Sequence, residues 1–458
     1  MPITLSDLQR ANAAPWLAVG AEAVRYLQRL VRFDTSNPPG NEQPAAEFLR
    51  DLLTSHGIEV WLGGPLENRT SLVARLRGDG SRAPLLLVSH LDVVPAPPAG
   101  WSVEPFGGIV KDDYLWGRGA MDCKYRVIAH AMVLLLLKRS RARLRRDIIM
   151  AACADEETGG QLGMEWLAQT HPEKIDAELV LGEGGGGEIP APRGSYCAVG
   201  TAEKGAVDVE IVIHGRPGHS LRIIPDNAMS RLGDVLARLK EQRLATRMTE
   251  SARLNILGIA AGQEPDVRVA LLSLLEDSCR EEGVSQLRRL APVLMAWLEP
   301  SLHNTITPTQ VVGGIGLHCY PPEISLKCNA RFLPSFSADE LIASVNRRLD
   351  GLEGVELRIL QVGANASESP VGTGLFNTLV ELMQELRPGV VVVPWLLGGE
   401  TDVRFLRGPG RAVYGFFPSL LDPPPGPPGG HGIDERVSLF NIRWSIMVLH
   451  ELSRRLCL

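Results

Sequence analysis

The chain has 458 residues, of which 45% are hydrophobic and 22% charged, and its formal net charge is -6. This length allows two or three domains with full-sized cores. The negative charge argues against a nucleic-acid-binding protein, which would carry a basic surface. The 7 cysteines are scattered without a C-x-x-C pair, which is typical of reduced thiols in a cytoplasm and argues against disulfides or a thiolate zinc site.

The sequence has no pattern of an export signal or a membrane anchor. The N-terminal stretch 1–16 lacks a basic start and an apolar core. The longest apolar run, at 131–137, is too short to cross a bilayer. We therefore expect a soluble cytoplasmic protein with neither nucleic-acid nor membrane partners.

The first part of the chain alternates apolar strands with helices. In chain order, the periodicity predicts a helix at 45–57, strands at 71–78 and 84–90, a helix at 125–140, and strands at 147–157 and 177–184. Buried strands that alternate with helices form an α/β sheet between helical layers. The ligands of such sheets bind beyond the carboxyl ends of the strands.

Near residue 200 the pattern changes. "AVDVEIVIHG" at 206–215 alternates apolar and charged residues, which indicates a strand with one exposed face. After it we expect a helix at 225–241, strands at 309–318 and 324–332, a helix at 338–350 and a strand at 355–361. This β-α-β-β-α-β order is that of a ferredoxin-like α+β sandwich.

The domain boundaries follow from these patterns. A helical insertion at about 243–303 separates the first helix of the sandwich from its second strand. After residue 364 the strand and helix pattern of the first part returns. We therefore expect a domain at 200–363 that is inserted into another domain formed by 1–199 and 364–458. A Pro/Gly-rich loop at 418–432 lies in the returning part and contains His431.

Acidic and histidine residues follow the predicted strands and fill the Gly-rich turns. They lie in "SHLDVVP", "GRGAMDCK", "ADEETGG", "LGEGGGG" and "GGHGIDE", which contain His90 with Asp92, Asp122, Asp155–Glu157, Glu183 and His431. Each motif alone has a simpler interpretation as a polar strand end or a flexible loop. Together they predict one site, because adjacent carboxylates such as Glu156 and Glu157 repel each other unless positive charge is near.

Two divalent metal ions that share a bridging carboxylate would supply that charge. Imidazole and carboxylate ligands without thiolate suit zinc, cobalt or manganese in an open, catalytic site. Such chemistry needs one carboxylate that is not a ligand, so that it can take a proton from water. The motifs of competing enzyme classes, G-x-x-x-x-G-K-[ST], G-x-S-x-G and H-E-x-x-H, do not occur.

In this order, the motifs above together with "GRPGHS" at 215–220 resemble the dinuclear zinc aminoacylase/carboxypeptidase family. This family includes aminoacylases, carnosinase, acetylornithine deacetylase, succinyl-diaminopimelate desuccinylase and carboxypeptidase G. "AEKGAVDVEI", "TDVRF" and "YGFFP" resemble the carboxypeptidase S and N-fatty-acyl-amino-acid hydrolase branch. The resemblance implies a zinc-exopeptidase-like catalytic domain, with a mixed sheet between helical layers, and an inserted ferredoxin-like lid or dimerisation domain.

The resemblance also implies a role for each site residue. One zinc would be bound by His90, Asp122 and Glu183, and the other by Asp122, Glu157 and His431, with cobalt or manganese as substitutes. Asp122 would bridge the two ions, often with a cis peptide bond after it. Asp92 would orient His90, and Glu156 would be the general base that acts on a metal-bridging water. His219 would contact the oxyanion, from the partner subunit of a homodimer in many relatives, and Asn304 and Arg331 would bind the substrate.

Two residues depart from the family pattern. Cys123, after the bridging aspartate, places a thiol close to two metals, where it could become oxidised or act as an additional ligand. Glu400, before the Thr401-Asp402 pair, would disfavour an anionic substrate if it faces the pocket.

We expect an amidohydrolase or exopeptidase that acts on N-acyl amino acids or short peptides. A carnosinase-like di- or tripeptidase and an inactive binding homologue are the alternatives.

Overall fold

A computed structural model of the chain describes residues 10–141, 143–363, 365–422 and 429–458. The first residues of the N-terminal stretch, residue 364 and residues 423–428 of the Pro/Gly-rich loop lie outside the described residues. The chain forms two compact units. Unit 1 comprises Met1–Thr201, Ser369–Trp395 and Thr401–Leu458, and unit 2 comprises Ala202–Glu368 and Leu396–Glu400. None of the described helices has the length and apolar character that a membrane span requires.

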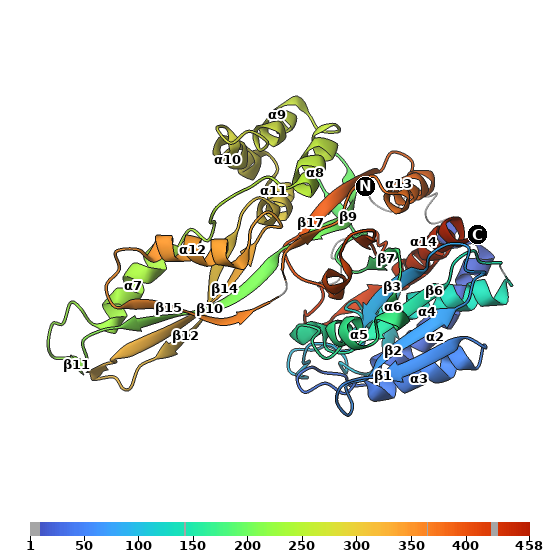
Figure 1. The fold of residues 1–458 in the computed structure, drawn as a ribbon, viewed down its shortest axis with the longest axis horizontal. Helices are drawn as coiled ribbons and strands as arrows, with labels where there is room; N and C mark the ends of the chain where they lie inside the picture. The colour runs from blue at the N-terminus through green and yellow to red at the C-terminus, as the bar shows by residue number, and fades with distance from the viewer. Residues whose placement is uncertain (1–9, 142, 364, 423–428) are drawn as a thin grey trace. The chain divides into compact units, whose positions relative to one another are not determined.

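Unit 1 is built on a mixed β-sheet (Figure 1). Along the sheet the strands follow the order β1 (Glu59–Gly63), β2 (Ser71–Leu76), β6 (Ile148–Cys153), β3 (Leu85–His90), β7 (Leu179–Gly182), β18 (Ala412–Gly415) and β9 (Ser195–Glu203). β3 pairs in parallel with β6 and β7, and β18 in parallel with β7, whereas β1, β2 and β6 pair antiparallel. β8 (Glu188–Pro190) and β17 (Val391–Leu397) also pair with β9.

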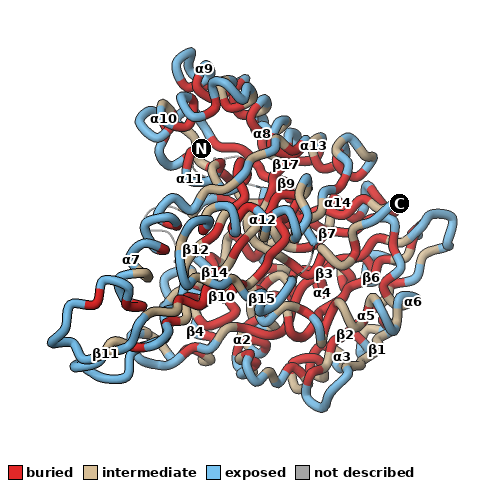
Figure 2. Tube along the Cα trace, turned by 60° about the vertical axis from the view of Figure 1, so that its left-hand side comes forward, coloured by how far each residue is buried: buried red, intermediate tan, exposed pale blue. Residues whose placement is uncertain are grey.

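Both faces of this sheet are buried, and Figure 2 shows β3 and β6 as buried segments. Leu85 and Leu87 of β3 belong to one hydrophobic cluster and Leu86 and Val88 to another, because successive side chains of a strand point to opposite faces. The helices of the unit are α2 (Ala14–Val31), α3 (Gln43–Thr54), α4 (Lys124–Arg139), α5 (Met164–Thr170), α6 (Pro172–Ile175), α13 (Gly374–Leu386) and α14 (Leu439–Cys457). A small sheet joins β4 (Ile109–Lys111), β5 (Tyr114–Trp116) and β19 (Arg436–Ser438).

Unit 2 contains a four-stranded antiparallel sheet in the order β12 (Thr305–Gly313), β14 (Glu323–Phe332), β10 (Gly205–His214) and β15 (Val355–Val362). α7 (Ala228–Leu239) and α12 (Ala338–Leu349) pack on it. In the chain these elements follow the β-α-β-β-α-β order of a ferredoxin-like sandwich. The predicted fold class, an α/β domain with an inserted ferredoxin-like domain, is confirmed.

The alternating pattern of β10 determines which of its faces is buried. Val207, Val209 and Ile211 join the core with residues of α7 and α12, whereas Asp208 and Glu210 are only half-buried. The second strand differs from its prediction at 309–318, because it begins at Thr305 and ends at Gly313. Gly314 and Gly316 then take positive φ angles of 93° and 158°, which turn the backbone out of the strand.

Between α7 and β12 the chain forms the helices α8 (Glu250–Ala260), α9 (Pro265–Ser273), α10 (Arg280–Leu290) and α11 (Pro292–Leu298). A two-stranded ribbon pairs β11 (Gly218–His219) with β13 (Cys319–Tyr320). β16 (Ser367–Glu368) pairs with the end of β9. Short 3₁₀ turns occur at Glu156–Thr158, Glu299–Ser301 and Asp402–Leu406.

Candidate metal centre

The carboxyl ends of the parallel strands bring the acidic motifs of unit 1 together. His90 is the last residue of β3 and pairs with Cys153, the last residue of β6. Asp155–Glu157 follow β6 directly, and Glu183 follows β7. Because neighbouring parallel strands end at the same edge, their following residues lie side by side.

The first group of possible metal ligands is His90, Asp122, Cys123 and Glu183. Each residue offers one ligand atom, and these atoms all lie within 4.8 Å of one another. Nε2 of His90 lies 3.3 Å from Oδ1 of Asp122 and 3.8 Å from Oε2 of Glu183. The thiol of Cys123, for which the sequence predicts either oxidation or a role as an additional ligand, lies within this group.

The second group is Asp122, Glu157 and His431, with the same spacing limit. Nε2 of His431 lies 2.9 Å from Oε2 of Glu157 and 3.7 Å from Oδ2 of Asp122. Asp122 therefore belongs to both groups, as a bridging ligand must. Gly430, next to His431, has to lack a side chain, because a Cβ atom there would lie 2.8 Å from Oδ2 of Asp122.

The donor sets of both groups fit divalent metal ions. Two ligands that each lie about 2.0–2.2 Å from one zinc ion are at most about 4.4 Å apart, and the distances of 3.3 and 3.8 Å in the first group and of 2.9 and 3.7 Å in the second are shorter than this. Imidazole nitrogen and carboxylate oxygen are common ligands of zinc. His431 has a positive φ of 68°, a costly conformation that occurs often at ligand sites.

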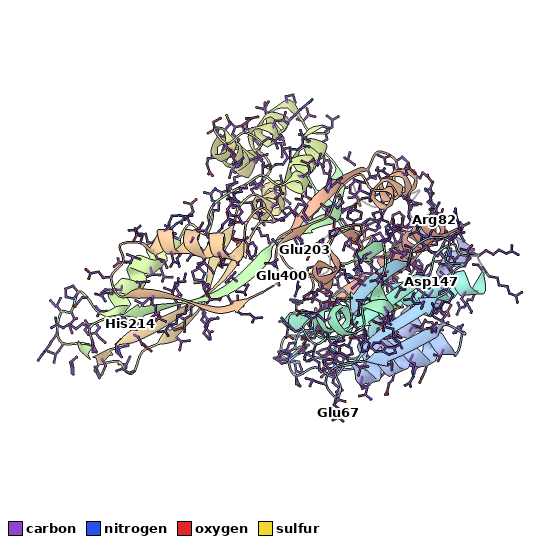
Figure 3. The ribbon with its side chains drawn as sticks, viewed as in Figure 1. Glu67, Arg82, Asp147, Glu203, His214 and Glu400 are labelled. Carbon is purple, nitrogen blue, oxygen red and sulfur yellow. The ribbon has the colours of Figure 1, made fainter. Side chains whose placement is uncertain are left out.

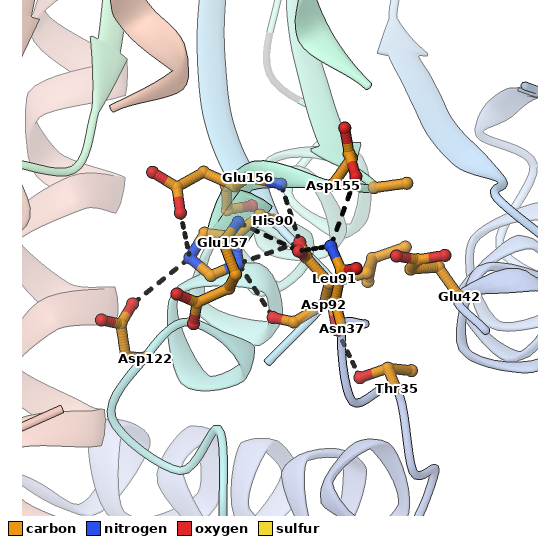
Figure 4. A network of polar contacts seen from close by, with 12 residues as sticks. Thr35, Asn37, Glu42, His90, Leu91, Asp92, Asp122, Asp155, Glu156 and Glu157 are labelled. Atoms are coloured by element: carbon orange, nitrogen blue, oxygen red, sulfur yellow. Dashed lines mark hydrogen bonds and ion pairs between the residues drawn. The ribbon is translucent and has the colours of Figure 1, made fainter. Parts of the chain in front are cut away.

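Asp92 holds the acidic turn after β6 in place (Figure 4). Its carboxylate accepts hydrogen bonds from the backbone N–H groups of Glu156 and Glu157 at 3.1 and 3.0 Å, and from Nδ2 of Asn37 at 2.9 Å. Nδ1 of His90 lies 2.9 Å from the backbone oxygen of Asp92 and 3.4 Å from its carboxylate. Donation from Nδ1 to the backbone oxygen leaves Nε2 to face Asp122 and Glu183.

Asp155 also stabilises this turn. It takes a positive φ of 74° and accepts hydrogen bonds from Nη2 of Arg69 at 2.7 Å and from Oγ1 of Thr158 at 2.8 Å. Arg69 also donates to the buried carboxylate of Glu42 at 3.0 and 3.1 Å. These buried, charge-assisted bonds fix the backbone that carries Glu156 and Glu157.

Glu156 points toward the first ligand group without belonging to either one. Its Oε2 lies 3.9 Å from Nε2 of His90, and Figure 4 shows this contact. Burial raises the pKa of Glu156 well above its usual range, and the nearby charge of Glu183 raises it further. A carboxyl group with a raised pKa and no ligand role is suited to accept and return a proton.

Arg126 is a site residue that the sequence analysis missed. Arg126 lies on α4, four residues after Asp122 in the chain. Its Nη1 contacts Glu183 and lies 3.7 Å from Oδ1 of Asp122. The guanidinium therefore places one fixed positive charge beside the first ligand group. In the sequence Arg126 belongs to an apolar helix pattern, and only its i, i+4 spacing from Asp122 is a signal.

Glu435 and Asp402 are two further buried acids near this site. Glu435 accepts hydrogen bonds from the backbone N–H groups of Met121 and Asp122 at 2.7 and 3.0 Å, and from Arg118 at 2.6 Å. Asp402 is 3% exposed, and its carboxylate oxygens have no hydrogen-bond partner among the described residues. Burial raises the pKa of Asp402 to about 8.

The remaining predicted site residues belong to unit 2. His219 is exposed on β11, where Nδ1 accepts the N–H of Leu221 at 3.2 Å. Asn304 is fully buried, and its Oδ1 accepts the N–H of Leu333 at 2.8 Å. Its Nδ2 has no hydrogen-bond partner in the part of the chain that the structure describes.

Arg331 and Glu400 form an ion pair within unit 2. Nη1 of Arg331 lies 3.5 Å from Oε1 of Glu400, which is labelled in Figure 3. Nε of Arg331 also donates to Oδ1 of Asn329 at 2.9 Å. The acid that departs from the family pattern therefore faces a predicted substrate-binding arginine.

The chain is similar to known proteins in sequence and in fold. The model of peptidase family M20/M25/M40 matches residues 86–455. The chain is 27% identical over 383 residues to the N-fatty-acyl-amino acid synthase/hydrolase PM20D1 of Mus musculus, covering 81% of this chain and 74% of the relative. It is 28% identical over 454 residues to the probable carboxypeptidase S-like 2 of Dictyostelium discoideum, covering 96% and 83%.

The fold is also similar to solved structures. The M20 family metallo-carboxypeptidase Sso-CP2 from Sulfolobus solfataricus superimposes with a TM-score of 0.70 at 16% sequence identity, over 94% of this chain and 98% of that one. At this identity the match supports the fold, and the family rests on the sequence comparison.

Proposed function

The chain belongs to peptidase family M20/M25/M40, and from this premise we propose that it hydrolyses the amide bond of N-acyl amino acids and releases the amino acid. Family membership makes the protein a hydrolase of the metallopeptidase and amidohydrolase type. The observation that carries the finer proposal is the assembly of two ligand groups around a shared Asp122, with Glu156 beside them.

The proposed cofactor is a pair of divalent ions, most naturally zinc. His90, Asp122 and Glu183 would hold one ion, and Asp122, Glu157 and His431 the other. Bound there, the ions would polarise the scissile carbonyl group and lower the pKa of the attacking water.

Glu156 performs the proton transfer in this proposal. Its carboxylate takes a proton from the attacking water as the new C–O bond forms at the carbonyl carbon. It then gives that proton to the amide nitrogen as the C–N bond breaks, so that the products are a carboxylic acid and a free amine. The raised pKa of Glu156 supports this role, because a base must hold the proton between the two steps.

For the residues of unit 2 we propose the roles that the family motifs imply. His219 would stabilise the oxyanion, and Asn304 and Arg331 would bind the substrate. The unpaired Nδ2 of buried Asn304 supports a binding role, because a buried donor without a partner is costly. A carboxylate of the amino-acid product would suit the planar guanidinium of Arg331.

We further propose that unit 2 acts as a lid and mediates formation of a homodimer. Its sheet has two edge strands, β12 and β15. Val311 and Val312 on β12, and Ile359, Leu360 and Val362 on β15, are large apolar residues that are about half exposed. Exposed apolar edge strands favour pairing with another sheet. Light scattering of the Val311→Lys variant should show monomers where the unaltered protein shows dimers.

A di- or tripeptidase is the second candidate, and one observation favours it. In the Arg331–Glu400 ion pair, the carboxylate of Glu400 lies beside Arg331, the residue that would otherwise bind an anionic group of the substrate. An acidic side chain in that position would attract the free ammonium group of a dipeptide and repel an anionic acyl group.

The test is product formation by the zinc-loaded protein on a matched panel of short-acyl amino acids, long-acyl amino acids and unblocked dipeptides. Preference for acylated substrates is the expected result. Preference for dipeptides would replace the proposal by the second candidate. No hydrolysis of any amide, with both metals bound, would favour a binding homologue without activity.

A further inference from the structure

The first ligand group contains a thiol that the family pattern does not supply. Cys123 is fully buried, and its Sγ lies within 4.8 Å of the ligand atoms of His90, Asp122 and Glu183. It forms no disulfide. A buried cysteine by itself behaves as a small apolar residue. Here, however, three other ligand residues of one ion surround the sulfur.

We propose that Cys123 is the fourth ligand of the ion held by His90, Asp122 and Glu183. The donor set becomes one imidazole nitrogen, two carboxylate oxygens and one thiolate sulfur. The thiol releases its proton to solvent as the metal–sulfur bond forms. This inference rests on the proposed dinuclear site and adds one ligand to it.

Four protein ligands change the character of this ion. Zinc sites with four protein ligands are closed and tetrahedral, whereas catalytic zinc sites have three protein ligands and one open position. An ion held by Asp122, Glu157 and His431 would have three protein ligands. A fourth protein ligand would therefore anchor the Cys123 ion more firmly than the ion at Asp122, Glu157 and His431.

The charges near Cys123 support an additional anionic ligand. Asp122, Glu183 and a thiolate would bring three negative charges to an ion of charge +2. Arg126 contacts Glu183 and lies 3.7 Å from Asp122, so its guanidinium places a fixed positive charge beside the thiol, which favours the thiolate.

The thiolate also predicts a metal preference. Soft sulfur ligands favour zinc and cobalt, whereas manganese and magnesium prefer oxygen. We expect the Cys123 site to select zinc or cobalt over manganese. The second site has only nitrogen and oxygen donors, so we expect it to discriminate less strongly between zinc or cobalt and manganese.

The test is a titration of the metal-free full chain with cobalt(II), followed by absorption in the near ultraviolet. A thiolate ligand gives a sulfur-to-cobalt charge-transfer band, which should reach saturation at one cobalt per chain. The Cys123→Ser variant should bind cobalt and lose the band. The matched control is Cys328→Ser, which changes an equally buried cysteine on β14 of unit 2 and should keep the band.

A second measurement does not depend on how well the serine variant folds. The Cys123→Asp variant replaces sulfur by an oxygen donor, and the ratio of zinc to manganese affinity should fall by at least about tenfold. Cobalt that binds to the unaltered protein without a charge-transfer band would overturn the role of Cys123 and leave the dinuclear site intact. Failure to bind any cobalt would overturn the metal centre itself.

Discussion

The carboxylate of Glu435 accepts a hydrogen bond from the backbone N–H of Asp122 at 3.0 Å. The residue shared by both ligand groups is therefore held by a side chain from the opposite end of the sequence. Glu435 is fully buried and also pairs with Arg118 at 2.6 Å. Four residues after His431, it connects the segment that carries one ligand to the turn that carries another.

We expect Glu435→Ala to lower both stability and metal affinity. The variant leaves the guanidinium of Arg118 buried without its partner, which costs about 3–5 kcal/mol. Loss of the support for Asp122 should weaken metal binding by roughly 10–100-fold. Urea unfolding and metal titration measure the two effects. The control is Asp434→Asn, which changes a partly exposed neighbour that contacts Ser102 and should alter metal affinity little.

Glu156→Gln should separate catalysis from metal binding. The amide keeps the shape of the carboxylate but cannot transfer a proton, so the rate should fall by about 10²–10⁴-fold. The metal content, measured by elemental analysis after dialysis, should stay at two ions per chain. The paired variant Glu157→Gln should instead lose the ion of the second ligand group. Equal metal loss in both variants would show that Glu156 is a ligand.

Arg126→Met should strengthen metal binding. The guanidinium contacts Glu183, so it competes with a bound metal ion for that carboxylate, and the two positive charges repel each other. We expect zinc affinity to rise by about tenfold or more, and the metal-free protein to become less stable because its carboxylates lose a cation. Calorimetric titration measures the affinity.

The control for this variant lies on the same helix. Arg139 pairs with Glu22 at 2.7 Å on the surface, and exposed ion pairs contribute only about 0–1 kcal/mol. Arg139→Met should therefore leave zinc affinity unchanged. Unchanged affinity in Arg126→Met as well would show that the guanidinium does not compete with the metal.

Because of Asp402, we expect the free energy of unfolding of the metal-free protein to fall as the pH rises. Burial raises its pKa from 3.8 to about 8, so the native state keeps a proton that the unfolded state has lost. Between these two values the native state binds more protons, and the free energy of unfolding decreases with pH. Asp402→Asn removes this titration. The free energy of unfolding of the variant relative to the unaltered protein, measured in urea, should therefore increase from pH 5 to pH 8.

Asp147 provides the comparison of opposite sign. Although burial opposes it, hydrogen bonds from the N–H of Gly78 at 2.8 Å and from Arg75 at 2.9 Å lower the pKa of this carboxyl group. Its stabilisation is present above the unfolded pKa and is lost as the pH falls through the lower native pKa. Asp147→Asn (Figure 3 labels the residue) should therefore cost most near neutral pH and least in acid.

The fold class was predictable because local patterns and tertiary burial agree. The apolar run before His90 becomes a strand buried on both faces, and the alternation of Val207 and Val209 with Asp208 becomes a half-buried strand. The exact ends were not predictable. The predicted strand at 147–157 ends at Cys153, because the backbone turns at Asp155, which has a positive φ. The hydrogen bond from Arg69 to the carboxylate of Asp155 stabilises this turn.

The site was predictable where a motif carries the chemistry. The structure brings His90, Asp122, Glu157, Glu183 and His431 into two overlapping groups, and their roles as ligands stay predictions. Glu435 was missed because "IDERVS" has the composition of an exposed turn, and its partners are backbone N–H groups 313 and 314 residues away. Such contacts leave no periodicity in the sequence. Arg126 was missed because it interrupts an otherwise apolar helix without disturbing the helical pattern.

The position of His431 has a consequence for how the protein matures. The second ligand group joins Asp122 and Glu157 to His431, which follows every strand of the large sheet in the chain. During synthesis, a ribosome-bound chain that has already folded β3, β6 and β7 still lacks this ligand and the Glu435 that supports Asp122. Binding of an ion by the second ligand group, as proposed, therefore requires that the chain has been synthesised past His431.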